Sequence, residues 1–346
     1  MDKIHLNKNQ FSDLINLRNN VFYPLKNFVS KEEFIQIINN KRYENQFFPL
    51  PITFGVTKEI YLRFQEKKSF DLYYKNKYLI NIYNVNFYNL DKKKISKKIY
   101  GINYLKHPYY KKFINENYKF MHFDFQKQNK INLRHKYFLS PSLFKKTLKV
   151  KKILKLSSFH TRNVPHKAHQ WIHNFLLKKS DMLLIQPLIG QYKKGEYKDS
   201  IIIKTNKIIS KTYKKKVRVI PFFSYPRYGG AKEAALHAIV RKNYGCSTFW
   251  VGRDHAGIGK FFSKYESQDF SKKNERKIGL KIVSEKEPYY CKKHLRVLNN
   301  CKCKKNYKIL ISGTKIRELI LKKKKINNIL MNPEVSKLLN INSIIK

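Results

Sequence analysis

The chain has 346 residues, of which 42% are hydrophobic and 14% aromatic, so it is long enough to form two domains with sizeable cores. No apolar run reaches the roughly 18 residues that cross a membrane, and the polar N-terminus is not a signal peptide, which makes the cytoplasm the expected location. The net charge of +51 comes from lysines spread along the whole chain. They accompany many Asn, Ile, Tyr and Phe residues, which AT-rich codons encode, so compositional drift explains the charge better than a nucleic-acid surface does.

The first 150 residues predict a β-rich domain without a chemical motif. Residues 1–50 have a mixed, largely helical pattern. Alternating apolar residues then predict short strands at 60–64, 70–74 and 78–83. Residues 91–150 are lysine-rich and are expected to be irregular, with turn signals at Tyr100-Gly101 and His107-Pro108.

From residue 152 onward the pattern alternates between strands and helices. The expected strands are 153–159, 182–186, 217–223 and 247–251, and the expected helices are 166–178, about 199–213, and 231–243. This alternation predicts an α/β domain with a Rossmann-like parallel sheet and helices on both faces. The polar turns 160–163 and 252–257 follow two of these strands. Because ligands bind at the carboxyl ends of parallel strands, both turns can face one cleft.

The segment 153–172 carries the first chemical motif. Pro165 favours a helix start, and the histidines at 166, 169 and 173 then fall on one helix face. Three hypotheses fit: surface histidines at a helix start, a metal site formed by these three imidazoles, or a phosphate site at a helix N-terminus with Arg162 as an added donor. The His-Glu-x-x-His pattern of zinc proteases is absent, which weakens the metal hypothesis.

Two later segments add donors for an anion. Gly252-Arg-Asp-His-Ala-Gly257 offers close backbone approach and a guanidinium, with Asp254 able to orient Arg253 or His255. In Ile311-Ser-Gly-Thr-Lys-Ile-Arg317, Ser312 or Thr314 can cap the next helix, and Arg317 can complete a second phosphate cradle.

Together these motifs resemble the α/β nucleotidyltransferase superfamily and, within it, the single-polypeptide ATP sulfurylase (sulfate adenylyltransferase) family. The similarity extends to Val21–Leu25, Pro49–Phe54, Ala235–Gly245 and Asn332–Leu339. It implies three segments: a PUA-like domain at 1–150, a catalytic domain at 151–310, and a C-terminal helical subdomain at 311–346. It also implies a homo-oligomer of two or more subunits.

The resemblance implies that a sulfate oxygen attacks the α-phosphorus of ATP, which yields adenosine 5′-phosphosulfate and pyrophosphate, with Mg²⁺ arriving on ATP. The implied catalytic residues are Thr161, Arg162, Asn163, His166 and His169. The implied sulfate-binding residues are His160, Arg162 and Ala256. The implied ATP-binding residues are His160, Thr161, Arg162, Asn163, Gly252, Arg253, Asp254, His255 and Val283.

Three positions depart from the family pattern. His160 stands where the family usually has a sulfate-contacting Gln, Val164 separates Asn163 from Pro165, and Gly229-Gly230-Ala231 replaces a frequent Ala-Gly-Pro. Two alternatives therefore stay open. One is an adenylyltransferase for another oxyanion. The other is a catalytically degenerate, basic nucleic-acid-binding protein, which the retained Arg, Asn and His residues argue against.

The segment 288–306 holds four residues of the types that bind zinc: Cys291, His294, Cys301 and Cys303. Thiolates and imidazole at this spacing suit a structural Zn²⁺ site, and the clustering fits a reducing compartment better than a disulfide framework. Many bacterial family members carry a similar zinc loop, with the ligands in a different order. The alternative is a group of unrelated reduced cysteines. Cys246 lies apart and is expected to be a buried small hydrophobe.

Overall fold

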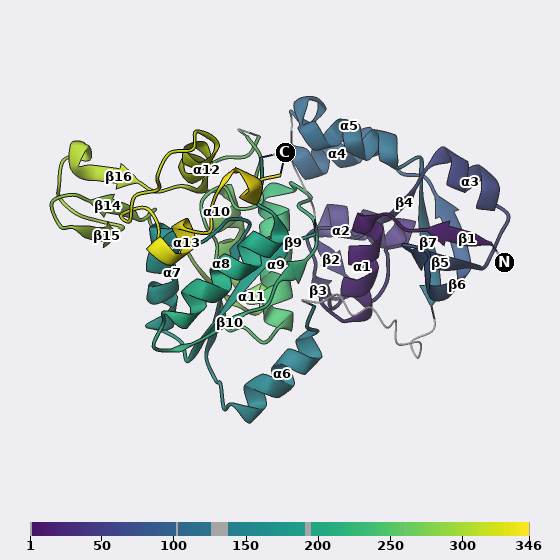
Figure 1. Ribbon diagram of the computed structural model, residues 1–346. Coiled ribbons are helices and arrows are strands. Elements are labelled where there is room, and N and C mark those ends of the chain that lie inside the picture. Colours follow the sequence, from purple (N-terminus) through teal and green to yellow (C-terminus); the bar gives the residue numbers. More distant parts are fainter. Residues whose placement is uncertain (1, 102, 126–137, 191–194, 260, 346) are drawn as a thin grey trace. The chain divides into compact units, whose positions relative to one another are not determined.

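The computed structural model describes residues 2–101, 103–125, 138–190, 195–259 and 261–345 (Figure 1). Its contacts divide the chain into two compact units, and each unit combines three separate segments. Unit 1 comprises residues 1–145, 224–245 and 253–282, and unit 2 comprises 146–223, 246–252 and 283–346. These two units are defined by contacts between residues. The three consecutive segments 1–150, 151–310 and 311–346 are implied by the family resemblance instead, and they stay a prediction. No helix among the described residues is long and apolar enough to cross a membrane.

Unit 1 contains a five-stranded sheet in the order β1-β5-β6-β7-β4, in which β1 pairs parallel to β5 and the other pairs are antiparallel. Its strands are β1 (Lys3–His5), β4 (Phe54–Val56), β5 (Phe70–Tyr74), β6 (Lys77–Tyr88) and β7 (Lys119–Phe125), and a small hairpin joins β2 (Arg42–Tyr43) to β3 (Gln46–Phe47). Phe28, Phe54 and Phe123 are fully buried beside this sheet and contact one another edge to face or tilted. The β-rich N-terminal domain and the strands expected at 70–74 and 78–83 are confirmed.

The strand expected at 60–64 is wrong, because this segment is the helix α3 (Lys58–Phe64). Thr57 caps it by accepting the backbone N–H of Ile60 at 3.3 Å, and Glu59 in the first turn complements the helix dipole. Local capping thus prevails over the alternation of apolar residues.

The irregular structure expected at 91–150 is also wrong for the described part of this segment, and residues 102 and 126–137 lie outside the described residues. The segment forms α4 (Lys92–Tyr100), α5 (Pro108–Glu116), β7 and α6 (Pro141–Val150). The two turn signals mark helix ends: α4 stops at Gly101, whose φ is +84°, and His107 is the N-cap of α5. Unit 1 is completed by α1 (Lys8–Arg18), α2 (Lys31–Asn40), α9 (Gly230–Asn243), α10 (Glu266–Lys273) and α11 (Glu275–Ile278).

Unit 2 is built on a sheet in the order β10-β9-β8-β12-β13, with β11 also pairing with β9. The strands are β8 (Leu156–Thr161), β9 (Met182–Ile189), β10 (Lys216–Val219), β11 (Phe222–Phe223), β12 (Thr248–Trp250) and β13 (Lys281–Val283). The β8–β9, β9–β10, β9–β11 and β8–β12 pairs are all parallel, which confirms the expected parallel α/β sheet. The strand expected at 217–223 is interrupted and forms both β10 and β11.

The helices of unit 2 bury their apolar faces in two clusters. One cluster joins Phe159, Leu183 and Ile185 of the sheet to Ile172 and Leu176 of α7 (Lys167–Leu177). The other joins α8 (Asp199–Lys211), α12 (Gly313–Leu321) and α13 (Pro333–Ser336). The segment Asn332–Leu339, which is similar to the C-terminal helix of the family, forms a helix only over the four residues of α13. Residues 191–194 of the loop before α8 lie outside the described residues.

A three-stranded antiparallel sheet in unit 2 carries the cysteine-rich segment. Its order is β15-β14-β16, with β14 (Tyr289–Cys291), β15 (Arg296–Leu298) and β16 (Lys308–Leu310).

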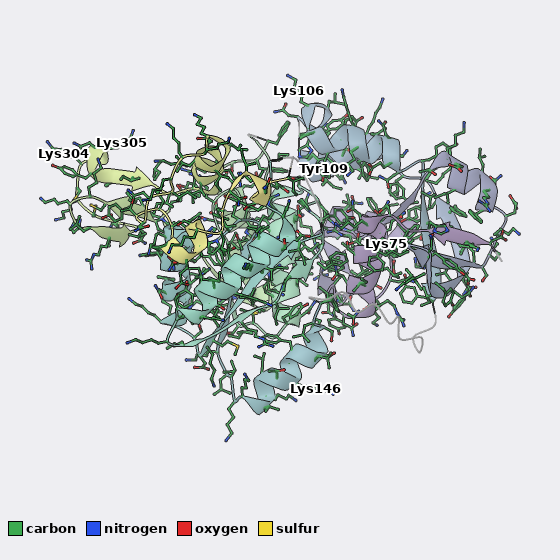
Figure 2. All side chains as sticks on the ribbon, in the orientation of Figure 1. Lys75, Lys106, Tyr109, Lys146, Lys304 and Lys305 are labelled. Atoms are coloured by element: carbon green, nitrogen blue, oxygen red, sulfur yellow. The ribbon has the colours of Figure 1, made fainter. Side chains whose placement is uncertain are left out.

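Lysine side chains project from elements of both units. Figure 2 labels Lys75 and Lys106 in unit 1, and Lys146, Lys304 and Lys305 in unit 2. All five are exposed, and compositional drift stays a prediction.

Candidate active site

The sheet of unit 2 reverses its strand order between β8 and β12. From β8 the chain proceeds outward through β9 to β10, and it then returns to the opposite side of β8 for β12 and β13. Trp250 of β12 lies opposite Phe159 of β8 in the parallel ladder, so the two strands end side by side. Such a switch point leaves a crevice at the carboxyl ends of the strands, where ligands of open α/β sheets bind. The segment 160–163 and Gly252 flank this point.

The residues expected in a turn at 160–163 are divided between strand and turn. His160 and Thr161 are the last residues of β8, pairing with Gln186 and Pro187, so the expected turn begins later than predicted and β8 begins later than residue 153. The Thr161 hydroxyl accepts the Asn163 N–H at 3.0 Å, which closes a compact turn. Val164 is fully buried in the cluster with α8, α12 and α13, so a branched apolar side chain has a packing role at this position.

The late Ser-Gly-Thr-x-x-Arg segment lies directly beside this turn. Ser312 caps α12 by accepting the Lys315 N–H at 3.2 Å. Arg317 donates one N–H to the Asn163 side-chain oxygen at 2.6 Å and another to the Thr314 hydroxyl at 3.3 Å. The structure therefore brings together two segments separated by about 150 residues of sequence. Arg317 therefore belongs with the candidate site residues. The sequence indicated it only as a residue that can complete a second phosphate cradle.

Gly313 lets α12 approach the turn. A Cβ at this position would lie 2.8 Å from Asn163 Cγ and Oδ1, closer than real Cβ atoms approach other groups. The family resemblance implies a catalytic role for Asn163. We therefore expect Gly313→Ala to displace Asn163 and to lower kcat about 100-fold, since small misplacements of catalytic groups have effects of that size. Thermal stability should change little, because Ala is the better helix former. Steady-state kinetics with a melting curve test this expectation.

Gly229→Ala is the matched control, because its Cβ would meet Glu233 and Leu50 at an ordinary 3.5 Å. Equal activities of the Gly313 variant and the wild type would contradict the importance of the close approach.

Of the three histidines after the turn, His166 and His173 are buried and His169 is half-buried, and each makes different contacts. His166 is the N-cap of α7 rather than part of it, and its Nδ1 accepts the His169 N–H at 3.2 Å, which leaves the ring proton on Nε2. The rings of His166 and His169 stack at 3.7 Å, and His173 hydrogen-bonds the Tyr213 hydroxyl at 2.8 Å. Burial lowers the pKa of His166 to about 4 and that of His173 to about 3, and it holds the pKa of His169 well below its usual value. All three are therefore neutral near pH 7.

These pKa shifts predict an acid-dependent loss of stability. An unfolded chain binds protons at its histidines near pH 6.5, whereas the folded chain binds them only near pH 4 and below, so protonation favours unfolding. The free energy of unfolding should be greatest above pH 6.5. For each of His166 and His173 it should fall by roughly 1.4 kcal/mol per pH unit between pH 6.5 and pH 4. Urea unfolding at pH 7.5, 6 and 5 measures this slope. His173→Phe should make the slope shallower, and an unchanged slope would refute the assignment.

The predicted nucleotide loop is divided between the two units, so its parts are described separately. Gly252 belongs to unit 2, and Arg253–Ala256 belong to unit 1. Of the two expected partners of Asp254, the structure shows Arg253, whose Nε lies 3.0 Å from the carboxylate. Asp254 and Ala256 have φ values of 52° and 58°, a strained conformation for residues with side chains that is frequent at ligand sites.

A chain of polar contacts in unit 1 leads from α9 to His255. Glu233 accepts the backbone N–H groups of Arg227 at 2.9 Å and Gly229 at 3.0 Å, which compensates for the lack of a side-chain cap on α9. Its carboxylate lies 3.7 Å from His237 Nε2, and His237 Nδ1 is 3.0 Å from His255 Nε2. Glu233 and His237 were not among the residues expected from the sequence; they lie four residues apart on α9 and are nearly completely buried. Their spacing puts them on one helix face, but their burial, which gives them importance, is visible only in the structure.

Two further expectations have simpler outcomes. Gly230 belongs to the Gly-Gly-Ala segment that differs from the family pattern. Its φ is +54°, and a Cβ there would meet the Phe262 ring at 2.5 Å, so glycine is required at this position. Val283 ends β13, where its carbonyl accepts the Val251 N–H at 2.9 Å beside Gly252. Its role toward adenine stays a prediction.

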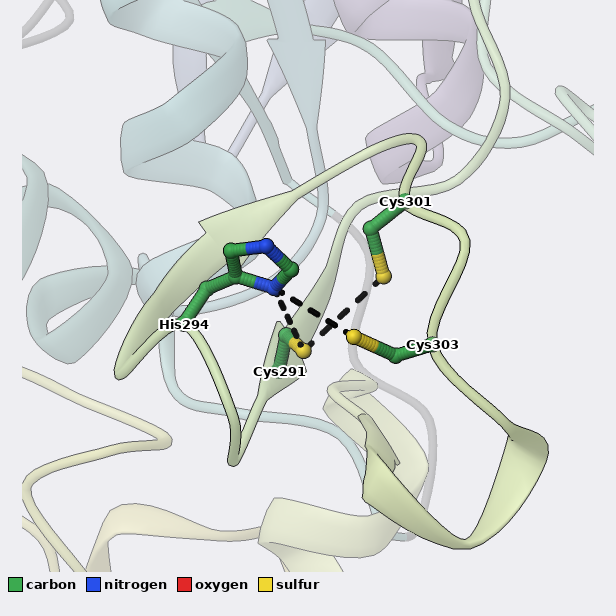
Figure 3. A group of neighbouring side chains, drawn as sticks. All are labelled: Cys291, His294, Cys301 and Cys303. Atoms are coloured by element: carbon green, nitrogen blue, oxygen red, sulfur yellow. Dashed lines mark hydrogen bonds between the residues drawn. The ribbon is translucent and has the colours of Figure 1, made fainter.

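The cysteine-rich segment of unit 2 folds into a compact ligand set (Figure 3). One ligand atom from each of Cys291, His294, Cys301 and Cys303 lies within 4.8 Å of all the others. Cys291 Sγ is 3.8 Å from Cys301 Sγ and 3.2 Å from His294 Nδ1, and Cys303 Sγ is 3.5 Å from the same nitrogen. The edges of a tetrahedron with Zn–S bonds of about 2.3 Å and a Zn–N bond of about 2.0 Å are about 3.5–3.8 Å long. The Tyr289 hydroxyl donates to Cys301 at 3.2 Å and thereby lowers the pKa of this thiol to about 7.

Cys246 lies apart from this group and is buried, as expected for a small apolar residue.

Comparisons with known proteins agree with both parts of the architecture. The ATP-sulfurylase family model matches residues 135–341, and the PUA-like domain model matches residues 1–121. The expected PUA-like domain followed by a parallel-sheet domain is thus confirmed. The chain is 31% identical to a sulfate adenylyltransferase of Pyrococcus abyssi, over 96% of this chain and 88% of that protein. It is 30% identical to a sulfate adenylyltransferase of Ignicoccus hospitalis, over 97% of this chain and 89% of that protein.

A solved structure shares the fold. It is the hexameric APS kinase from Thiobacillus denitrificans, which matches with a TM-score of 0.73 at 13% identity. The match covers 97% of this chain but only 62% of that chain, which is less than two thirds of its length. At this identity the likeness concerns the fold alone.

Proposed function

The chain belongs to the ATP sulfurylase family, and from this premise we propose that it is a sulfate adenylyltransferase. A sulfate oxygen attacks the α-phosphorus of ATP in line with the leaving pyrophosphate, and adenosine 5′-phosphosulfate forms. No covalent enzyme intermediate is required. Catalysis then depends on positioning the two anions and on stabilising the charge that moves onto pyrophosphate.

The strand-order reversal between β8 and β12 is the observation that carries this proposal. It brings the only Thr-Arg-Asn turn of the sequence to the carboxyl edge of a parallel sheet. This turn lies next to α7, which has the buried His166 at its N-cap and the half-buried His169 in its first turn. Asn163 is held there by Arg317. Donors for sulfate and phosphate oxygens come from a helix N-terminus, two neutral imidazoles and two guanidinium groups. None of these groups carries a negative charge that would repel the anions.

We assign each role to a named residue. Arg162, His160 and the Ala256 backbone bind sulfate. Thr161 and Asn163 shape the turn, and His166 and His169 hold the phosphates through ring N–H groups. Gly252, Arg253, Asp254, His255 and Val283 bind the nucleotide, with His237 and Glu233 orienting the His255 ring. Mg²⁺ arrives with ATP as part of the substrate and offsets phosphate charge.

We also propose a structural Zn²⁺ ion on Cys291, His294, Cys301 and Cys303. The fit rests on the donor set and on separations close to those of a tetrahedral site. Bound zinc would link the hairpin β14–β15 to the segment before β16. It would take no part in the transfer reaction. Thiolate ligands of this kind persist in a reducing compartment, which supports the cytoplasm as the location.

The family resemblance also supports self-association, and sedimentation analysis measures it directly. Dimers or larger assemblies are the expected species.

The decisive experiment measures ATP formation from adenosine 5′-phosphosulfate and pyrophosphate. This direction is thermodynamically favourable, because the phosphosulfate anhydride is cleaved, so weak activity is detectable. The forward reaction should then be compared with sulfate, selenate, molybdate and phosphate, since His160 replaces the usual Gln. ATP formation and a preference for sulfate are expected. A folded protein that produces no ATP would refute the proposal, and a preference for another anion would favour the related adenylyltransferase.

A further inference from the structure

Gln186 is a fully buried amide whose two polar atoms lack hydrogen-bond partners. Its exposed fraction is 0%, and neither Nε2 nor Oε1 has a partner in the part of the chain that the structure describes. Buried amides are almost always paired, because an unpaired one loses its hydrogen bonds to water without compensation. The surrounding strand, β9, is otherwise apolar from Met182 to Ile189. Gln186 therefore has the features of a residue that pairs with a bound ligand.

The register of the sheet places this amide beside the candidate sulfate site. Gln186 lies directly opposite His160 in the parallel β8–β9 ladder. Neighbouring strands are about 4.8 Å apart, and paired residues project from the same face. Phe159 and Ile185, one residue earlier on each strand, face the other way, into the apolar cluster with α7. His160 and Gln186 consequently form a polar pair at the carboxyl end of the sheet.

We propose that Gln186 is a specificity-determining residue that donates its Nε2 N–H to an oxygen of the bound sulfate. This inference rests on the proposed function. The strand that faces His160 thus supplies an amide donor next to the candidate sulfate site. Sulfate accepts hydrogen bonds only, so Oε1 must turn away from it, and the donor orientation of the amide is fixed by the ligand.

Gln186→Met tests the proposal, because Met matches Gln in length and shape but has no N–H donor. We expect the KM for sulfate to rise about 10- to 100-fold, as for the loss of a hydrogen bond to a charged group, with the KM for ATP within twofold of the wild type. The melting temperature should stay the same or rise, since an unpaired buried amide is removed. Gln186→Glu should weaken sulfate binding further by repulsion.

Asn206→Leu is the matched control. Asn206 is also a buried amide of unit 2, but it lies on α8 and donates to the Ile202 carbonyl. It should leave the KM for sulfate unchanged. The double variant His160→Gln/Gln186→Met restores one amide on the same face and should recover most of the lost sulfate affinity, which a purely structural role would not produce.

Sulfate binding measured without turnover separates this inference from the function. The stabilisation of the wild type by sulfate, in the presence of a non-hydrolysable ATP analogue, should be lost in Gln186→Met. A wild type that binds sulfate but produces no ATP would refute the function and leave the Gln186 contact intact. An active Gln186→Met enzyme with an unchanged KM for sulfate, or a variant that does not fold, would overturn the inference.

Discussion

Arg162→Ala is expected to reduce ATP formation from adenosine 5′-phosphosulfate and pyrophosphate about 1,000-fold. The guanidinium follows the last residue of β8 at the switch point of the sheet. It is the group best suited to hold a tetrahedral oxyanion in line with the α-phosphorus, because it presents paired N–H donors. Loss of one such donor from a preorganised anion site has effects of this order. Luminescent detection of ATP measures the rate over this range.

Two further variants test whether the loss of activity comes from the paired N–H donors of Arg162. Arg162→Lys keeps the charge but not the paired donors, so its activity should fall between those of the wild type and Arg162→Ala. Arg218→Ala removes an exposed arginine from β10 in the same sheet and should have no effect. Activity of Arg162→Ala within tenfold of the wild type would show that the anion is held elsewhere.

Cys291→Ser should remove bound zinc and open the β14–β16 sheet. Cys291 is fully buried, and it ends β14, which pairs with both β15 and β16. Without metal, the two remaining thiols, the imidazole and the new hydroxyl would be crowded together in a lysine-rich loop that has little core of its own. Metal binding in such sites supplies much of the local folding free energy. We expect the zinc content to fall from about one equivalent to almost none, and trypsin to cleave rapidly between residues 292 and 308.

Cys246→Ser provides the control, since this cysteine lies outside the ligand set. It should retain zinc and resist trypsin in the cysteine-rich segment. Wild-type protein that contains no zinc after expression in zinc-supplemented medium would contradict the metal site.

The sequence predicted the parts of the fold in which local pattern and tertiary structure agree. The strands of unit 2 are nearly continuous apolar runs, such as 182–189, and they alternate with helices, so the parallel sheet was predictable. The segment 58–64 shows the opposite case. Its apolar spacing fits a strand as well as a helix, and a single capping hydroxyl on Thr57 favours the helix. Short segments with two possible periods cannot be assigned without their contacts.

The candidate site was predictable where its residues follow one another in the sequence. The residues proposed to bind sulfate and phosphate are adjacent in the turn after β8 and at the start of α7, and the proposed zinc ligands are close together in the cysteine-rich segment. Gln186, His237 and Glu233 were not predictable, because their importance comes from register or burial. Gln186 matters only because the ladder sets it opposite His160, a relation across 26 residues that no local pattern contains.

The division of each unit into three chain segments has a consequence for protein synthesis. As the chain leaves the ribosome, the strands β1 to β7 emerge first and can pair at once. The helices α9 to α11 of the same unit follow only after β8, β9 and β10 of the other unit. Unit 2 in turn is complete only after β12, β13 and the last helices have been synthesised. Neither unit can therefore finish folding during translation before most of the chain has been made, and many contacts join distant segments, which favours slow folding and a need for chaperones.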